Sequence, residues 1–226
     1  MSFTDRSDAG RRLAARLRHL QGDRPIVLAL PRGGVPVAFE IARELKAPLD
    51  LLLVRKIGAP RQPELALGAV ADGTPPQIFI DREMAAALAV PQAYVEQETA
   101  RQLAELERRR IAYCAGRPPI EIAGRTAIVV DDGIATGATM RVALIAARQR
   151  GPSRLVLAAP VGAPEALAQL GPLADEIVCV ETPRGLGAIG SCYADFHQVG
   201  DAEVTDLLAR AARAISSPPA PGCPES

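Results

Sequence analysis

Two adjacent carboxylates end an aliphatic run near the middle of the chain. Residues 126–130 predict a buried strand, and Asp131 and Asp132 follow at its carboxyl end. The next residues are small and lead to Thr139, where we expect a helix to begin. Such a turn lets backbone N–H groups approach an anion at a helix N-terminus, which suits a phosphate monoester. The residues expected to bind this ligand are Asp131, Asp132, Gly133, Ala135, Thr136, Gly137, Ala138 and Thr139.

Carboxylates beside a phosphate site fit a phosphorylated sugar. The two acids could accept hydrogen bonds from vicinal hydroxyls, or hold Mg²⁺ indirectly through water. The alternative is a solvated Asp-Asp-Gly turn in which Thr136 or Thr139 caps the next helix. The aliphatic strand before the acids and the Thr-Gly-Ala-Thr segment after them favour the ligand site.

Two basic segments end earlier apolar runs. Arg32 precedes Gly33 and Gly34, whose freedom permits close backbone approach, so this segment could bind a diphosphate. Arg55 and Lys56 follow the next apolar run. Taken alone, the first segment also fits an ordinary strand-to-helix turn, and the second a solvated basic pair.

These segments alternate with helices in a βα pattern. Connections of this kind give parallel strands and right-handed crossovers, so we expect one doubly wound sheet. If the loops after the first and third strands meet on one ligand, the strand order is 2-1-3-4-5. Strands are expected at 26–30, 49–54, 126–130, 155–160 and 176–180, and helices at 4–20, 35–45, 139–150, 163–170 and 201–215.

The middle of the chain interrupts this alternation. Residues 55–76 are rich in Gly, Pro and charge and should be the least regular, with a brief hairpin from 67–70 and 77–80. Asp81 should cap a short helix, and Pro91 should open a longer helix that ends near residue 115.

Composition narrows the function classes. The formal net charge is zero, which argues against a nucleic-acid partner. No apolar run reaches the ~18 residues of a membrane span, so no membrane partner is expected. The four cysteines are scattered and there are only two histidines, so we expect neither a metal-ligand cluster nor a disulfide framework. A cytoplasmic, reduced protein is the simplest interpretation.

The segment Asp131–Thr139 resembles the 5-phosphoribosyl-1-pyrophosphate (PRPP) motif of type I phosphoribosyltransferases. The resemblance extends to Arg32-Gly-Gly-Val-Pro, Arg55-Lys56 and Pro63-Glu-Leu, and covers the chain from about residue 6 to residue 208. It is strongest to a bacterial group of such enzymes whose substrate is undefined.

The resemblance implies an α/β fold: a doubly wound five-stranded parallel sheet with a flexible loop or hairpin, a helical insertion and a small hood. We expect a single domain at 1–215 and a disordered tail at 216–226. The core is expected at about 25–60 and 124–182, the loop and helical insertion at 57–118, and the hood at 1–20 and 181–200.

The implied reaction is Mg²⁺-dependent transfer of the phosphoribosyl group to a nitrogenous acceptor, with a nucleobase as the expected choice, and release of pyrophosphate. Arg55, Lys56 and Glu64 would be catalytic, with Glu64 as a general base or a mere surface-loop residue. Residues 57–74, including Arg61, would form a mobile lid. The residues expected to bind pyrophosphate are Arg32, Gly33, Gly34, Arg55 and Lys56.

The acceptor is the least defined part of this function. Ala135 stands where enzymes of 6-oxopurines carry a further Asp, which disfavours hypoxanthine and guanine. Tyr193 and Phe196 could stack on the acceptor, or form a hydrophobic plug. We expect a homodimer. The alternatives are a non-catalytic PRPP-sensing regulator on the same fold, or a hydrolase or phosphorylase of PRPP or another ribose phosphate.

Overall fold

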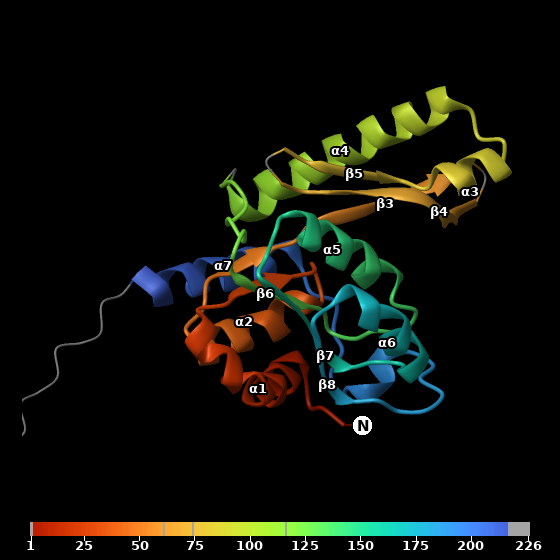
Figure 1. The fold of residues 1–226 in the computed structure, drawn as a ribbon. Helices are drawn as coiled ribbons and strands as arrows, with labels where there is room; N and C mark the ends of the chain where they lie inside the picture. The colour runs from red at the N-terminus through yellow and green to blue at the C-terminus, as the bar shows by residue number, and fades with distance from the viewer. Residues whose placement is uncertain (1, 61, 74, 116, 217–226) are drawn as a thin grey trace, which may run out of the picture.

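The computed structural model describes residues 2–60, 62–73, 75–115 and 117–216, without the side chains of residues 63, 64, 215 and 216. Within these residues a five-stranded parallel sheet has the order β2-β1-β6-β7-β8, which confirms the predicted 2-1-3-4-5 order (Figure 1). Its strands are β1 (Ile26–Ala29), β2 (Leu49–Leu51), β6 (Thr126–Val130), β7 (Arg154–Val161) and β8 (Glu176–Glu181).

Helices cover both faces of the sheet because its strands are apolar on both. Ile128 and Val130 pack with residues of α1, α2 and α7, whereas Ala127 and Val129 pack with residues of α5 and α6. The predicted doubly wound α/β fold is therefore confirmed. These helices are α1 (Arg6–Arg16), α2 (Gly34–Leu45), α5 (Ala138–Gln149), α6 (Pro164–Leu170) and α7 (Asp201–Ser216).

The N-terminal helix is shorter than expected. Asp5 caps α1, because its carboxylate accepts a hydrogen bond from the Asp8 N–H at 2.7 Å. The helix ends at Arg16, and the chain continues as a 3₁₀ helix, η1 (Arg18–Asp23). The predicted helix at 4–20 is thus correct in place but not in length.

The middle of the chain is more regular than predicted. β3 (Val54–Ala59), β4 (Gln62–Ala71) and β5 (Gln77–Ile80) form an antiparallel sheet, followed by α3 (Arg82–Ala87) and α4 (Gln92–Cys114). The β4–β5 hairpin confirms the brief hairpin, and Asp81 caps α3, but the irregular loop expected over 55–76 is wrong. Gly58 within β3 and Pro60 directly after it weaken the strand signal in the sequence, and the pairing of β3 with β4 shifts register around Gly58.

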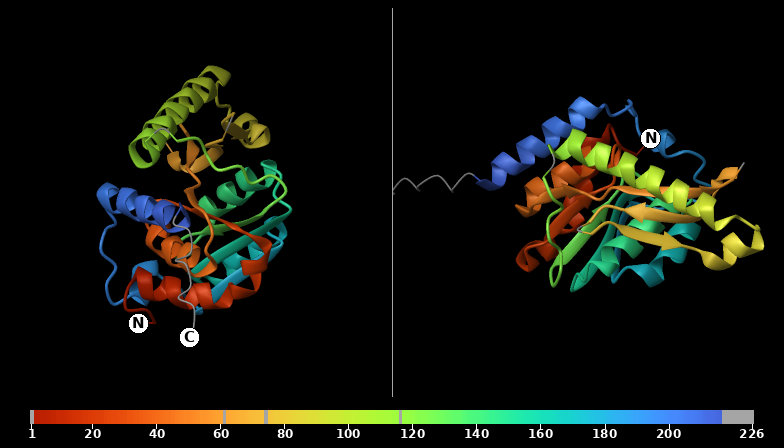
Figure 2. Two further views of the ribbon diagram at one scale, coloured as in Figure 1. Left: turned by 90° about the vertical axis from the view of Figure 1, so that its left-hand side faces the viewer. Right: turned by 90° about the horizontal axis from the view of Figure 1, so that it is seen from above.

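The second predicted strand, 49–54, is also divided between two sheets. β2 ends at Leu51 in the parallel sheet, and Val54 begins β3 of the antiparallel sheet. The insertion lies beside α5 as a separate layer, with α4 along its outer side (Figures 1 and 2). The short second strand therefore links the insertion directly to the sheet that carries the acids.

A buried ion-pair network fixes α4 to this junction. Arg110 of α4 lies 3.0 Å from Asp50 Oδ2 of β2 and 3.2 Å from Asp72 Oδ2, which directly follows β4. Asp72 also accepts a hydrogen bond from the Leu53 N–H at 3.0 Å. Because these side chains are buried, loss of one partner would leave an uncompensated charge in the interior.

Asp72 should make stability depend on pH. Burial raises its pKa from 3.8 to about 6, against the opposing charge of Arg110. Because the pKa of Asp72 is raised in the folded protein, its protonated form stabilises the fold. This stabilisation is complete below pH 3.8 and is lost as the pH rises through about 6. Between pH 4 and 7 the free energy of unfolding of the wild type should fall, and that of Asp72→Asn should fall by on the order of 3 kcal/mol less. Urea unfolding at a series of pH values measures both. Parallel curves for the two proteins would contradict this.

The N-terminal segment meets the segment that follows β8. The Phe3 backbone forms a bridge with Tyr193, next to the short 3₁₀ helix η3 (Ile189–Cys192). The segments 1–20 and 181–200, expected to form the hood, are therefore in contact where the structure describes them. Of the expected disordered tail, only Ser216, which ends α7, belongs to the described residues. None of the described helices combines the length and the hydropathy that a membrane span requires.

Candidate functional site

The acid pair lies at the carboxyl end of β6, where a turn of small residues leads into α5. Gly137 occupies the N-cap of α5 with a left-handed φ of 77°, which glycine adopts without strain. The Ala138 N–H donates to the Thr136 hydroxyl at 3.4 Å. α5 begins at Ala138, one residue earlier than the expected start at Thr139. Thr136, Ala138 and Thr139 are exposed at the start of this helix, so an anion can reach its N-terminus.

The two carboxylates have different surroundings. Asp131 accepts a hydrogen bond from the Asp132 N–H at 2.9 Å, and burial together with the Asp132 charge raises the pKa of Asp131 well above its usual range. Burial also raises the pKa of Asp132, but Arg6 opposes this shift through a 2.8 Å ion pair. Asp131 thus gains less compensation from neighbouring charge than Asp132.

Arg6 is a site residue that sequence reasoning missed. Its Nε donates to Asp132 Oδ2, its Nη1 donates to the His197 carbonyl at 2.8 Å, and its guanidinium lies 3.8 Å from the centre of the Phe196 ring. One signal was available, because Arg6 falls on the same helical face as the buried Ala9 and Leu13. An arginine on an apolar face predicts a buried anionic partner.

The glycines after β1 touch the acids directly. A Cβ atom on Gly33 would lie 2.0 Å from Asp132 Oδ2, and one on Gly34 would lie 2.6 Å from the Val130 carbonyl. The peptide bond between Pro31 and Arg32 is cis. The predicted pyrophosphate segment and the predicted ribose-phosphate segment are therefore in contact.

A pocket of about 360 Å³ lies between this glycine turn and the hood. Arg6, Arg32, Asp132 and Phe196 are among its lining residues. Arg32 also lies 3.5 Å from Asp201 of α7. The pocket is thus the part of the site nearest to the hood, where the acceptor was expected.

Tyr193 and Phe196, the two aromatic residues expected in the acceptor pocket, lie in different surroundings. Tyr193 is 2% exposed and packs against Phe3, and its hydroxyl donates to the Asp132 carbonyl at 2.6 Å. Tyr193 is therefore packed as the alternative of a hydrophobic plug describes, and it does not line this pocket. Phe196 is 37% exposed and does line the pocket.

The basic pair lies across a second pocket from the phosphate turn. This pocket, of about 610 Å³, is bounded by Arg55 and Lys56 on one side and by Thr136 and Thr139 on the other. The Nε of Arg55 donates to Gln102 Oε1 of α4 at 2.8 Å. Burial and then the charge of Arg109 lower the pKa of Arg55.

Two other expected residues lie outside this description. Arg61 is not among the described residues, and Glu64 belongs to β4 but its side chain is not described. In the described part of the chain no three His, Cys, Asp or Glu side chains form a metal-binding group. A Mg²⁺ ion would therefore need ligands from a bound substrate as well as from the acid pair.

The parallel sheet with the 2-1-3-4-5 order, the acid pair after its third strand and the glycine turn after its first agree with the fold expected from the resemblance to type I phosphoribosyltransferases. The sequence agrees, since residues 4–181 match the family described as phosphoribosyl transferase domain. The chain belongs to this family.

Two proteins and one solved structure are similar to this chain over most of its length. Two Mycobacterium tuberculosis proteins, named "Putative phosphoribosyl transferase" Rv0571c and MT0597, are 47% identical over 212 residues. These residues are 93% of the chain but 47% of each relative, so the chain spans about half the length of these proteins. The crystal structure of TT1426 from Thermus thermophilus is 44% identical, with a TM-score of 0.82 over 93% of this chain and 99% of that one.

Proposed function

We propose that the protein transfers the 5-phosphoribosyl group of PRPP to a nitrogenous acceptor, most simply a nucleobase, with release of pyrophosphate. The observation that carries this proposal is the contact between Gly33 and Asp132. It brings the glycine turn expected to bind pyrophosphate against the acids expected to bind ribose. A single PRPP molecule has both groups, so one ligand would account for both segments.

Each part of PRPP has a matching part of the site. The 5-phosphate suits the turn from Gly133 to Thr139, where backbone N–H groups and the α5 N-terminus favour an anion. The ribose hydroxyls suit the carboxylates of Asp131 and Asp132. The diphosphate suits the glycine turn and the side chains of Arg32 and Arg55.

The expected chemistry is positional and electrostatic. The acceptor nitrogen forms a bond to ribose C1, the bond from C1 to the diphosphate oxygen breaks, and the electron pair leaves with pyrophosphate. Positive charge would develop on the ribose ring, and the negative charge of the half-buried acid pair would stabilise it. A bound Mg²⁺ would neutralise diphosphate charge and reach Asp131 and Asp132 through water.

The acceptor would enter the pocket lined by Arg6, Arg32 and Phe196. Ala135 cannot act as a base, so the proton lost by the acceptor must go to another group or to water. We therefore expect hypoxanthine and guanine to be poor acceptors.

Pyrophosphate release from PRPP tests the proposal. With Mg²⁺ and a panel of nucleobases, we expect release that depends on one of the bases, measured by a coupled pyrophosphate assay. Release without any acceptor would instead indicate a hydrolase, and release with orthophosphate alone would indicate a phosphorylase. PRPP binding by calorimetry without release with any acceptor would indicate a regulator.

A further inference from the structure

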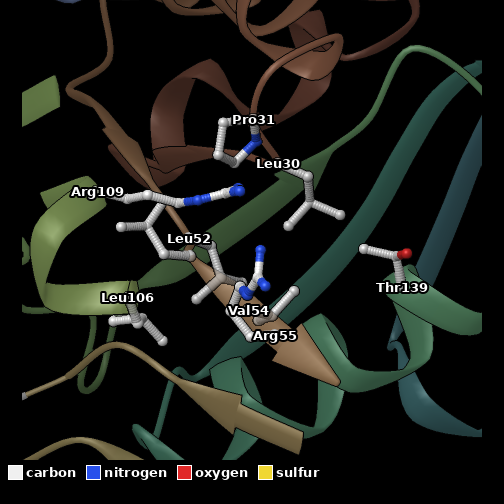
Figure 3. A pocket seen from close by; sticks show the side chains of 9 residues that line it. Leu30, Pro31, Leu52, Val54, Arg55, Leu106, Arg109 and Thr139 are labelled. Atoms are coloured by element: carbon white, nitrogen blue, oxygen red, sulfur yellow. The ribbon is translucent and has the colours of Figure 1, made fainter. Parts of the chain in front are cut away.

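A small pocket joins the insertion helix α4 to both anion-binding segments (Figure 3). The free space inside it is only about 30 Å³, room for little more than a water molecule, so a ligand would lie at the mouth of the pocket. Pro31 comes from the glycine turn, Thr139 from the start of α5, Arg55 from β3 and Arg109 from α4. α4 therefore contributes a cation to a space that already borders the proposed substrate site.

The two arginines are held in a similar way. Glu105 Oε1 accepts from Arg109 Nε at 2.8 Å, and Gln102 Oε1 accepts from Arg55 Nε at 2.8 Å. Both acceptors lie on α4, so the helix anchors each guanidinium at its Nε. In Figure 3 the outer ends of Arg55 and Arg109 converge on the same space below Pro31.

The like charges of Arg55 and Arg109 repel each other, although the carboxylates of Glu105 and Glu98 offset part of this repulsion. Burial and the charge of Arg109 both lower the pKa of Arg55, as expected for two like charges in partly apolar surroundings. Among the described residues that line the pocket none is acidic, and most are apolar. A ligand with several negative charges would relieve the repulsion between the guanidinium groups, and each could bind phosphate oxygens in a forked geometry.

We propose that Arg109 binds the diphosphate of PRPP together with Arg55, so that the insertion helix supplies part of the leaving-group site. This inference rests on the proposed function and adds a binding residue to it. As the bond from C1 to oxygen breaks, negative charge gathers on pyrophosphate between Arg55 and Arg109. Arg109 would therefore stabilise both the bound donor and the departing product.

Neighbouring Arg108 provides a matched control. It also pairs with Glu105, at 2.7 Å, but its side chain is 67% exposed and it does not line the pocket, whereas Arg109 is 34% exposed. Arg108→Gln and Arg109→Gln thus each remove one charge and one ion pair to the same carboxylate. Only Arg109→Gln removes a charge from the pocket.

Calorimetry with three ligands measures the effect. We expect Arg109→Gln to weaken Mg²⁺-pyrophosphate and Mg²⁺-PRPP roughly ten- to hundredfold, because charged hydrogen bonds are lost. Ribose 5-phosphate, which lacks the diphosphate, should bind to Arg109→Gln as to wild type. Arg108→Gln should bind all three ligands as wild type does. Arg109→Lys, which keeps the charge without the fork, should lie between wild type and Arg109→Gln.

Several results would overturn the inference. Unchanged pyrophosphate affinity in Arg109→Gln, or an equal loss for ribose 5-phosphate, would show that Arg109 does not contact the diphosphate. If Arg109→Gln unfolds, the pyrophosphate affinity of Arg109→Lys is measured instead, with Arg108→Gln as the control. A wild-type affinity in Arg109→Lys would then show that the forked guanidinium of Arg109 does not bind pyrophosphate. If wild type binds pyrophosphate but not PRPP, the proposed function fails and the role of Arg109 is still measured. Binding of neither ligand overturns both.

Discussion

The double substitution Asp131→Asn and Asp132→Asn is expected to abolish PRPP turnover while leaving the fold intact. Amide groups keep the size of the carboxylates but remove the negative charge that faces the developing positive charge on ribose. Loss of a preorganised electrostatic contact at a reacting centre costs about 10²- to 10³-fold in rate, and two such losses should leave no measurable turnover. PRPP affinity, measured by calorimetry, should fall as well.

The fold should survive because ionised acids are costly at this position. Burial raises the pKa of both carboxylates, and for Asp131 the neighbouring Asp132 charge raises it further. Neutral amides remove that repulsion. Arg6 loses its anionic partner, but it keeps the His197 carbonyl and the Phe196 ring. We therefore expect opposing changes in stability and a melting temperature near that of wild type.

A control for this experiment lies on α7. Asp206 is 58% exposed and pairs with Arg210 on its own helix, and it lines none of the three pockets described at the site, so Asp206→Asn removes a carboxylate from outside them. It should leave PRPP binding and turnover unchanged. Wild-type PRPP affinity in the Asp131/Asp132 double variant would exclude the acid pair from the binding site.

The sequence predicted the parallel core well because its signals are local. Residues 127–130 are aliphatic throughout, and the turn after them is built of small residues, so strand, turn and helix could be placed without any distant contact. The strand order followed from one assumption, that the loops after the first and third strands share a ligand. Gly33 against Asp132 is consistent with that assumption.

The missed features depend on contacts between distant segments. β3 contains Gly58 and a basic pair and is recognisable as a strand only through its partner β4, with α4 packed against both. Arg6 gains its place at the site from Asp132, 126 residues away in the sequence. Arg109 looks like a solvated helix residue until α4 is placed beside Arg55 and Pro31. The periodicity of apolar residues along the sequence does not show which distant segments come into contact.

Gly33→Ala should cause the second large loss of function, for a purely steric reason. Gly33 has φ −61° and ψ −34°, so its backbone accepts alanine without strain. The new Cβ, however, would lie 2.0 Å from Asp132 Oδ2, and Arg6 holds that oxygen from the other side at 2.8 Å. The glycine turn or the carboxylate must move, and displacement of about 1 Å in a positioned site costs about 10²-fold in rate.

Gly22→Ala is the matched control for this substitution. Gly22 lies in η1, and a Cβ there would meet no atom within 4 Å. Both substitutions restrict the unfolded chain equally, which alone would stabilise the protein by about 0.4–1 kcal/mol. We expect Gly22→Ala to be neutral or slightly stabilising in urea unfolding, with wild-type kinetics. For Gly33→Ala the free energy of unfolding should fall by about 1–3 kcal/mol, because the added methyl group overpacks the site.

The kinetic pattern of Gly33→Ala separates two explanations. If the glycine turn positions the diphosphate against the acids, kcat/KM for PRPP should fall about 10²-fold, while ribose 5-phosphate still binds at the turn after β6. Wild-type kcat/KM in Gly33→Ala would show that the contact between Gly33 and Asp132 has no part in catalysis. Equal weakening of ribose 5-phosphate would instead mean that Asp132, rather than the glycine turn, had moved.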